Sequence, residues 1–380
     1  MVANNEKTSN DESNRITTWG FSSFIVTLTK SGFIGMASYI MFYYSNIDSY
    51  ISAILGSIIG IIPLLIFVFL MKHSENKDIL ELNTSLFGKI FGNILNFILN
   101  LTILFMAIVA LYNISQFTEI QYMPDTDTNY LKILILVPIV YAASKNITVI
   151  SKISQIILII NFLIFVFTLL GFIGKCDITN IFPIMQDGAM PVLKSTLIYF
   201  IFSTFPTFML TIIPQDKVMQ EKHKTRKIFF MYGLGNLMLI VIILTTILIL
   251  GGDLIPMFRY PEYIALKRFQ LFGLIERVEN TLSLQFVFNT IMYLIISFHF
   301  IIQSLKKILK NNQRENFFPY ILAIIILIAS NLIFKNTVES SNFIKNYIPY
   351  IISIGIFSPM IITFLGLIIK NLKNKLKAKS

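Results

Sequence analysis

The chain contains 380 residues, of which 55% are hydrophobic and only 13% are charged, and its mean hydropathy is +0.73. An average soluble domain carries about 25% charged residues, so this composition lacks the polar surface that a soluble particle of this size needs. The aromatic fraction of 14% excludes a disordered chain. The composition therefore predicts an all-α polytopic membrane protein, and the net charge of +11 has to be explained within that class.

Residue types that build metal and catalytic centres are scarce and scattered. The chain has one cysteine, Cys176, and three histidines, His73, His223 and His299, without H-E-x-x-H spacing. It contains no G-x-S-x-G elbow, no P-loop and no pair of membrane aspartates of the protease type. We therefore expect no enzyme activity, no metal site and no cofactor.

Hydropathy divides the chain into a polar start, a membrane domain and a basic end. Residues 1–15 include Glu6, Asp11 and Glu12, which favours a cytoplasmic tail over a signal peptide. About 20 apolar residues in a helix cross a hydrocarbon core of about 30 Å, and ten segments within residues 16–370 fit that rule. A basic cytoplasmic tail is expected at 371–380. The predicted spans are 16–44, 49–71, 90–116, 131–143, 149–174, 190–213, 228–250, 282–302, 318–334 and 347–369.

The basic residues are distributed as topology signals. With the N-terminus inside, 21 of the 31 lysines and arginines fall in cytoplasmic segments, nine in outer segments and one, Lys30, within a span. This bias predicts that both termini are cytoplasmic. It also accounts for the net charge without a nucleic-acid partner, and the lysines of the last segment fit an anchor beside anionic lipid.

The longest outer loop, residues 251–281, mixes aromatic and charged residues. Its stretch at 259–272 has the composition of an interfacial helix. A packing cap over the transmembrane core is the simpler interpretation and the one we expect.

Two predicted spans carry interruptions. The first contains Ser-Gly-Phe-Ile-Gly at 31–35, and the sixth contains Ser-Thr-Phe-Pro-Thr at 203–207. Non-helical backbone at membrane depth is tolerated where it lines a cavity or is buried in protein. The alternative is that glycine permits close packing and that proline only kinks a helix. The two breaks open the two five-span halves, about 16–174 and 190–370, and corresponding breaks indicate an inverted-repeat transporter site.

Lys30 is the most unusual charge in the sequence. It lies 14 residues from each end of the first predicted span, which is about 21 Å along a helix. Insertion scales place the cost of such a lysine at about 2.5–3.5 kcal/mol, and its stem is too short to reach the interface. We expect Lys30 to face a cavity or a partner. Lys152, near the cytoplasmic end of span five, can snorkel, and His299 is expected to be a packed neutral histidine.

Several local patterns together resemble the B subunit of the nutrient germinant receptors of bacterial spores. This permease-like family is related to the amino acid–polyamine–organocation transporters, and the resemblance extends over most of the chain. The similar segments are 78–92 (D-I-L-E-L…L-F-G-K-I-F-G), 116–126 (Q-F-T-E…M-P-D-T), 177–194 (D-I-T-N-I-F-P…G…P-V-L-K), 205–206 (F-P), 260–263 (Y-P-E-Y) and 272–279 (F-G-L-I-E-R-V-E).

The sequence also departs from the family pattern at four places. No proline follows the glycines of span one in the segment 36–39, and Thr207 rather than a glutamate follows the Phe-Pro of span six. Asp127 replaces a proline in the turn after span three, and Lys152 stands where the family tends to have an arginine.

The resemblance implies a five-plus-five inverted repeat with broken helices 1 and 6 and a small-molecule pocket at the midplane. Amides near the first break would take a carboxylate, and carbonyls and hydroxyls near the second would take an ammonium. Lys30 or Lys152 would stand in for a coupling cation. The residues implied to wall the pocket are Ser31, Gly32, Phe33, Ile34, Gly35, Ser203, Thr204, Phe205 and Thr207.

The resemblance further implies a receptor subunit in the inner spore membrane or the cell membrane. It would bind a germinant, an amino acid in the first instance, beside A and C partner subunits, and binding would shift a two-state helix arrangement. The alternative is a proton- or sodium-coupled amino acid transporter, because both functions need the same broken helices. A structural scaffold with an inactive pocket is the third possibility.

Overall fold

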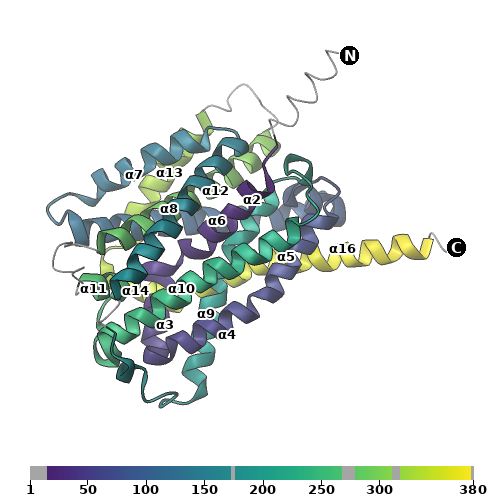
Figure 1. The fold of residues 1–380 in the computed structure, drawn as a ribbon. Helices are drawn as coiled ribbons and strands as arrows, with labels where there is room; N and C mark the ends of the chain where they lie inside the picture. The colour runs from purple at the N-terminus through teal and green to yellow at the C-terminus, as the bar shows by residue number, and fades with distance from the viewer. Residues whose placement is uncertain (1–14, 173–175, 268–278, 310–316, 378–380) are drawn as a thin grey trace, which may run out of the picture.

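A computed structural model describes residues 15–172, 176–267, 279–309 and 317–377 (Figure 1). Within these ranges the chain is almost entirely helical, and its extended pairing is a single bridge between Ile16 and Val218. Helices are the expected solution for a chain in lipid, because each satisfies its backbone polar groups within one segment. The predicted all-α membrane class is confirmed.

The first two predicted spans form one run of helical pieces. The run covers 56 residues, or about 84 Å if it were straight, which is far more than one membrane thickness. It reverses at Asn46, whose φ of 44° and ψ of −120° are not helical. Its elements are α2 (Thr18–Ser31), η1 (Phe33–Ala37), α3 (Ser38–Ser45), η2 (Asn46–Asp48), α4 (Ser49–Ile59) and α5 (Ile61–His73).

The remaining elements include a helix for every other predicted span. They are α6 (Ile79–Tyr122), α7 (Thr128–Ala143), α8 (Ile147–Phe172), η3 (Ile178–Ile181), α9 (Ala189–Thr204), η4 (Phe205–Ile212), η5 (Gln215–Lys217), α10 (Lys224–Leu254), η6 (Ile255–Met257), α11 (Pro261–Lys267), α12 (Glu279–Leu309), α13 (Phe318–Leu332), α14 (Thr337–Asn346), α15 (Ile348–Ile352), η8 (Ser353–Phe357) and α16 (Ser358–Lys377). However, α6 begins 11 residues before its predicted span, and α14 lies between two predicted spans.

Seven helical runs of the described residues are long and apolar enough to cross a membrane, or eight if the bent pair α13 and α14 counts as one span. The run Thr18–His73 folds back on itself, and the short apolar helix α7 adds one more segment. These elements are compatible with the ten predicted spans, while the inverted repeat stays a prediction.

Helix ends follow ordinary capping chemistry. The Thr17 hydroxyl accepts a hydrogen bond from the Gly20 amide at 3.0 Å and begins α2. The Asp78 carboxylate accepts from the amides of Leu80 and Glu81 at 3.1 Å and begins α6. α16 continues eight residues beyond the predicted span, because its lysine-rich end still favours helix, and it extends past the bundle in Figure 1. The predicted tails at 1–14 and 378–380 lie outside the described residues.

α2 lies at the centre of the bundle, between α10 on one side and α8 and α12 on the other (Figure 1). Every residue of α2 except Trp19 is buried. The most exposed apolar side chains instead lie on peripheral helices, for example Ile90 at 83% and Leu332 at 78%, as expected for surfaces that face lipid. The first helix break therefore lies in the interior of the protein.

Candidate functional site

The first break interrupts the central helix just after Ser31. Ile34 adopts an extended conformation, with ψ of 128°, and Gly35 has a φ of +71°. This positive φ suits glycine. The position is also crowded, because a Cβ on Gly35 would lie 2.9 Å from Cδ1 of Tyr260 and closer still to Cε1. The glycines at 32 and 35 therefore do more than allow helix packing, since they permit a true backbone interruption.

The backbone freed at this break is bound by a side chain of α6. The Asn113 Nδ2 donates to the carbonyl of Ile34 at 3.2 Å. Its Oδ1 accepts from the Arg259 guanidinium at 3.3 Å and from the Tyr260 hydroxyl at 3.5 Å. Asn113 is fully buried, so this side chain connects the break to the outer loop.

The second break replaces α-helix with a 3₁₀ segment. α9 ends at Thr204, and η4 begins with Phe205 and Pro206, which has no amide hydrogen to donate. The Thr207 hydroxyl donates to the Thr204 carbonyl at 2.6 Å, and the Thr204 hydroxyl is 2.8 Å from the Tyr232 hydroxyl. The hydroxyls of this break are thus bound within the protein.

The two breaks meet at a small cavity of about 20 Å³. That volume holds about one water molecule, so the junction is closed to anything larger. Gly32 and Phe202 are in close contact here, since a Cβ on Gly32 would lie 3.1 Å from the Phe202 ring. The cavity is lined by Ser31, Gly32, Met36, Met106, Ala110, Phe202, Pro206, Tyr293, Ile352 and Ile356.

All nine predicted pocket residues are buried, but only two of them, Ser31 and Gly32, line this cavity. The other seven lie in the surrounding packing: Phe33, Ile34, Gly35, Ser203, Thr204, Phe205 and Thr207. Sequence reasoning missed Phe202 and Tyr293. Phe202 directly precedes the predicted run, whereas Tyr293 comes from α12 and only the tertiary packing brings it to the site.

Lys30 lies one residue before this junction and is bound by an amide. Its ammonium donates to Gln285 Oε1 at 2.9 Å, and the Met238 sulfur is 3.8 Å away. The Gln285 Nε2 in turn donates to the Asn161 carbonyl at 3.0 Å, and Asn161 and Asn289 join their side-chain amides at 2.8 Å. The ammonium therefore joins a buried polar network across α2, α8 and α12.

Lys152 is placed differently. Its side chain is exposed on α8, whereas Lys30 is only 5% exposed. The structure therefore separates the two lysines that the sequence proposed for the same role.

The outer loop covers the first break. We call residues 259–267, which include helix α11, the outer cap, because the predicted topology places this loop on the outer side of the membrane. The rings of Tyr260 and Tyr263 are buried against Phe117, with centroids 5.0 Å and 5.6 Å away. Tyr260 also contacts Gly35. The described part of the loop has the geometry of the packing cap expected from the sequence, and residues 268–278 of that prediction lie outside the described residues.

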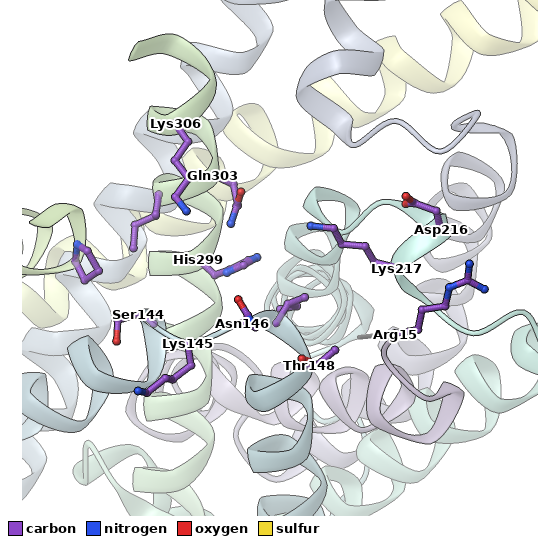
Figure 2. Close-up of a pocket in the computed structure, with 14 residues that line it drawn as sticks. Arg15, Ser144, Lys145, Asn146, Thr148, Asp216, Lys217, His299, Gln303 and Lys306 are labelled. Carbon is purple, nitrogen blue, oxygen red and sulfur yellow. The ribbon is translucent and has the colours of Figure 1, made fainter. Parts of the chain in front are cut away.

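A larger cavity of about 600 Å³ opens at the end of the bundle where α2 begins (Figure 2). Lys217, His299 and Asn146 point towards its interior, whereas Lys145 points away and lies over the Tyr141 ring. None of the residues of either break lines it. Its lining consists of Arg15, Ala143, Ser144, Lys145, Asn146, Ile147, Thr148, Asp216, Lys217, His299, Ile302, Gln303, Lys306 and Pro319.

Sequence comparison gives one family and one curated relative. The family model described as "Spore germination protein" matches residues 16–338. The spore germination protein YndE of Bacillus subtilis (strain 168) is 20% identical over 281 residues, which are 74% of this chain and 77% of YndE.

Two similar solved structures are membrane transporters. One is Mhp1, a nucleobase-cation-symport-1 family transporter in a closed conformation with bromovinylhydantoin bound, with a TM-score of 0.65 and 11% identity over 92% of this chain and 78% of Mhp1. The other is a Na⁺-coupled sialic acid symporter in a substrate-bound outward-open state, with a TM-score of 0.61 and 13% identity over 90% of this chain and 79% of the symporter. At these identities the likeness shows the fold alone, which this chain shares with the two transporters.

Proposed function

Because this chain belongs to the spore germination protein family, we propose that it is the membrane subunit of a nutrient germinant receptor that binds an amino acid where its two helix breaks meet. The observation that carries the proposal is the meeting of two interrupted helices at one interior cavity in a transporter fold. Such breaks place helix ends, with their partial charges, beside a ligand at membrane depth.

The two ends offer complementary charges. α3 begins just after the first break, so the partial positive charge at its N-terminus favours the ligand carboxylate. α9 ends at Thr204, so the partial negative charge at its C-terminus favours the ligand ammonium. Phe202 has to withdraw from Gly32 to make room, because the cavity now holds about one water. Ligand binding thereby selects a more open arrangement that partner subunits can detect.

Lys30 places its amino group next to this site. Its ammonium, bound to Gln285, takes the place of a coupling cation, so germinant binding is proposed not to require sodium. Lys152 is left out of the mechanism because its side chain is exposed. The A and C subunits as partners, the inner spore membrane as location and the cytoplasmic termini belong to the same proposal.

The alternative is a proton- or sodium-coupled amino acid transporter, and it is favoured by the symporter folds of the two similar structures. Two assays separate the functions. Purified protein in liposomes is tested for uptake of labelled amino acids under ion gradients, and spores of a deletion strain are tested for nutrient germination. Loss of germination without uptake supports the receptor, and robust uptake with normal germination overturns it.

The site itself is tested by filling the junction. Gly32→Leu places a side chain against Phe202 and should abolish amino acid binding measured by calorimetry on the purified full chain. Gly233→Leu is the matched control, because Gly233 is a glycine of α10 with open space around its Cβ position. Equal binding by both variants would show that the junction of the breaks is not the site.

A further inference from the structure

Glu262 of the outer cap is a buried carboxylate with no ion-pair partner among the described residues. The residue is 1% exposed, and neither carboxylate oxygen has a hydrogen-bond partner among the described residues. The Ser38 hydroxyl, at the start of α3, is also buried and lacks a partner within the same described part of the chain. An ionised carboxylate in such a position is strongly disfavoured unless a cation or a proton neutralises it.

The neighbouring cations of the described chain bind other groups, although the Arg259 Nε is itself buried and has no partner among the described residues. The Arg259 guanidinium donates to Ser340 Oγ at 3.2 Å and to Asn113 Oδ1 at 3.3 Å. The Lys267 ammonium lies over the Tyr263 ring and donates to Gln121.

The elements packed against the cap supply no neutralising cation from their described residues. The outer end of α10 contributes Asp253, which is exposed, and α6 contributes the phenols of Tyr112 and Tyr122. The outer turns of α12 contribute the uncharged side chains of Asn280, Ser283 and Gln285. Burial accordingly raises the pKa of Glu262 to about 7, and the nearby Ser38 hydroxyl opposes that shift in part.

Glu262 is connected to the first helix break through Tyr260 and Ser38. It is two residues from Tyr260, whose ring lies on Gly35 and whose hydroxyl meets Asn113. Ser38 follows the break directly on the same helix. Hydration of Glu262 therefore requires the cap to move, because the carboxylate, with Ser38 beside it, is 1% exposed in the present arrangement.

We propose that Glu262 is a proton-binding site of the outer gate: the protonated carboxyl is accommodated when the cap lies on the helix break, and ionisation releases the cap. The proton comes from the solvent and returns to it, and no other reactant takes part. This inference concerns access to the break and holds whether or not the bound solute is an amino acid.

The size of the effect follows from the two states. A hydrated glutamate has a pKa of about 4.5 and the buried one about 7, so the closed cap binds a proton roughly 300-fold more tightly. The opening constant of the cap should therefore rise more than tenfold between pH 5 and pH 7 and then level off.

Hydrogen exchange of the full-length protein in detergent micelles tests this. Exchange rates of peptides covering 259–267, divided by the intrinsic rate at each pH, are measured from pH 5 to pH 8. Protection of the cap should fall more than tenfold up to pH 7 in the natural protein. Glu262→Gln, a neutral isostere, should remove this pH step.

Two further variants make the outcome decisive. Glu339→Gln is the matched control, because Glu339 is an exposed carboxylate on the outer helix α14, and it should leave the step unchanged. Ser38→Ala removes the hydroxyl beside the carboxyl, so the upper end of the pH step should move to higher pH. This variant tests the proposal even if Glu262→Gln does not fold. A natural protein without a pH step, or a step retained in a folded Glu262→Gln, overturns the proposal.

Discussion

Gly35→Ala should destabilise the protein through two separable effects at the first helix break. The substitution forces a side chain into a φ of +71°, which costs about 1–2 kcal/mol for an L-residue. It also places a Cβ against the Tyr260 ring and 3.1 Å from Asn113 Oδ1, and overpacking of this kind costs about 1–3 kcal/mol. The sum is a loss of about 2–5 kcal/mol in the free energy of unfolding.

Two other glycines separate these effects. Gly88 has a φ of +78° with nothing within 4 Å of its Cβ position, so Gly88→Ala should show the conformational cost alone. Gly233 has neither a positive φ nor a close neighbour, and Gly233→Ala in α10 should stabilise by up to about 1 kcal/mol through helix propensity. The loss in unfolding free energy caused by Gly35→Ala, minus the loss caused by Gly88→Ala, then measures the cost of the contact between the outer cap and the break.

The assay is denaturant unfolding of the purified protein in mixed micelles, followed by circular dichroism. Tyr260→Ala removes the ring, so in that background Gly35→Ala should cost little more than Gly88→Ala does in the natural protein, because only the 3.1 Å contact with Asn113 Oδ1 remains. The coupling free energy of this double-mutant cycle should be about 1–3 kcal/mol. If Gly35→Ala costs no more than Gly88→Ala in the natural background, the cap does not press on the break and the reasoning is wrong.

Three further predictions concern Glu262, Lys30 and Asp78. Unfolding free energy should fall by about 3 kcal/mol as pH rises from about 4.5 to 7, because the raised pKa of Glu262 makes the folded state bind the proton more tightly, and Glu262→Gln should lose this dependence in pH-resolved denaturation. Lys30→Met should abolish germinant binding in calorimetry yet leave a folded protein, since it removes a buried charge along with its bond to Gln285; unchanged affinity would remove Lys30 from the mechanism. Asp78→Ala should lower the free energy of unfolding by about 1–2 kcal/mol more than Asp78→Asn, because asparagine still caps the N-terminus of α6 while both variants lose the ion pair with Lys307. Equal losses in thermal unfolding would show that Asp78 does not stabilise α6 as its N-cap.

The state of the junction bears on how a ligand reaches it. The outer cap lies on the first break, the cavity between the breaks holds about one water, and the 600 Å³ cavity at the other end does not reach the breaks. The structure is therefore closed around its candidate site. Opening on the cap side requires Tyr260 to leave Gly35, which is why the protonation of Glu262 and the substitution of Gly35 probe the same movement.

Much of the architecture could be predicted because its signals are local. A run of apolar residues long enough for the hydrocarbon core located the membrane helices, but the start of α6 and the ends of α12 and α16 extend well beyond their predicted spans. Gly35 and Pro206 marked the two interruptions, because a positive φ and a missing amide hydrogen are properties of single residues. The depth of Lys30 followed in the same way from counting positions along a helix.

The composition of the site was decided by contacts between distant segments. Of the predicted wall, only Ser31 and Gly32 line the cavity, since Phe202 and Tyr293 fill the space on the other side.

The partner of Lys30 shows the same limit. No mid-span acid exists to pair with it, and the structure supplies the amide of Gln285 from a helix 255 residues further along the chain. Glu262 was visible in the sequence as one charge in a loop, and only its burial in the folded chain makes it the proposed proton-binding site. Hydrophobicity and backbone freedom act within a few residues and can be predicted locally, whereas burial and hydrogen bonding of a side chain depend on which segments meet, and those meetings come from the whole fold.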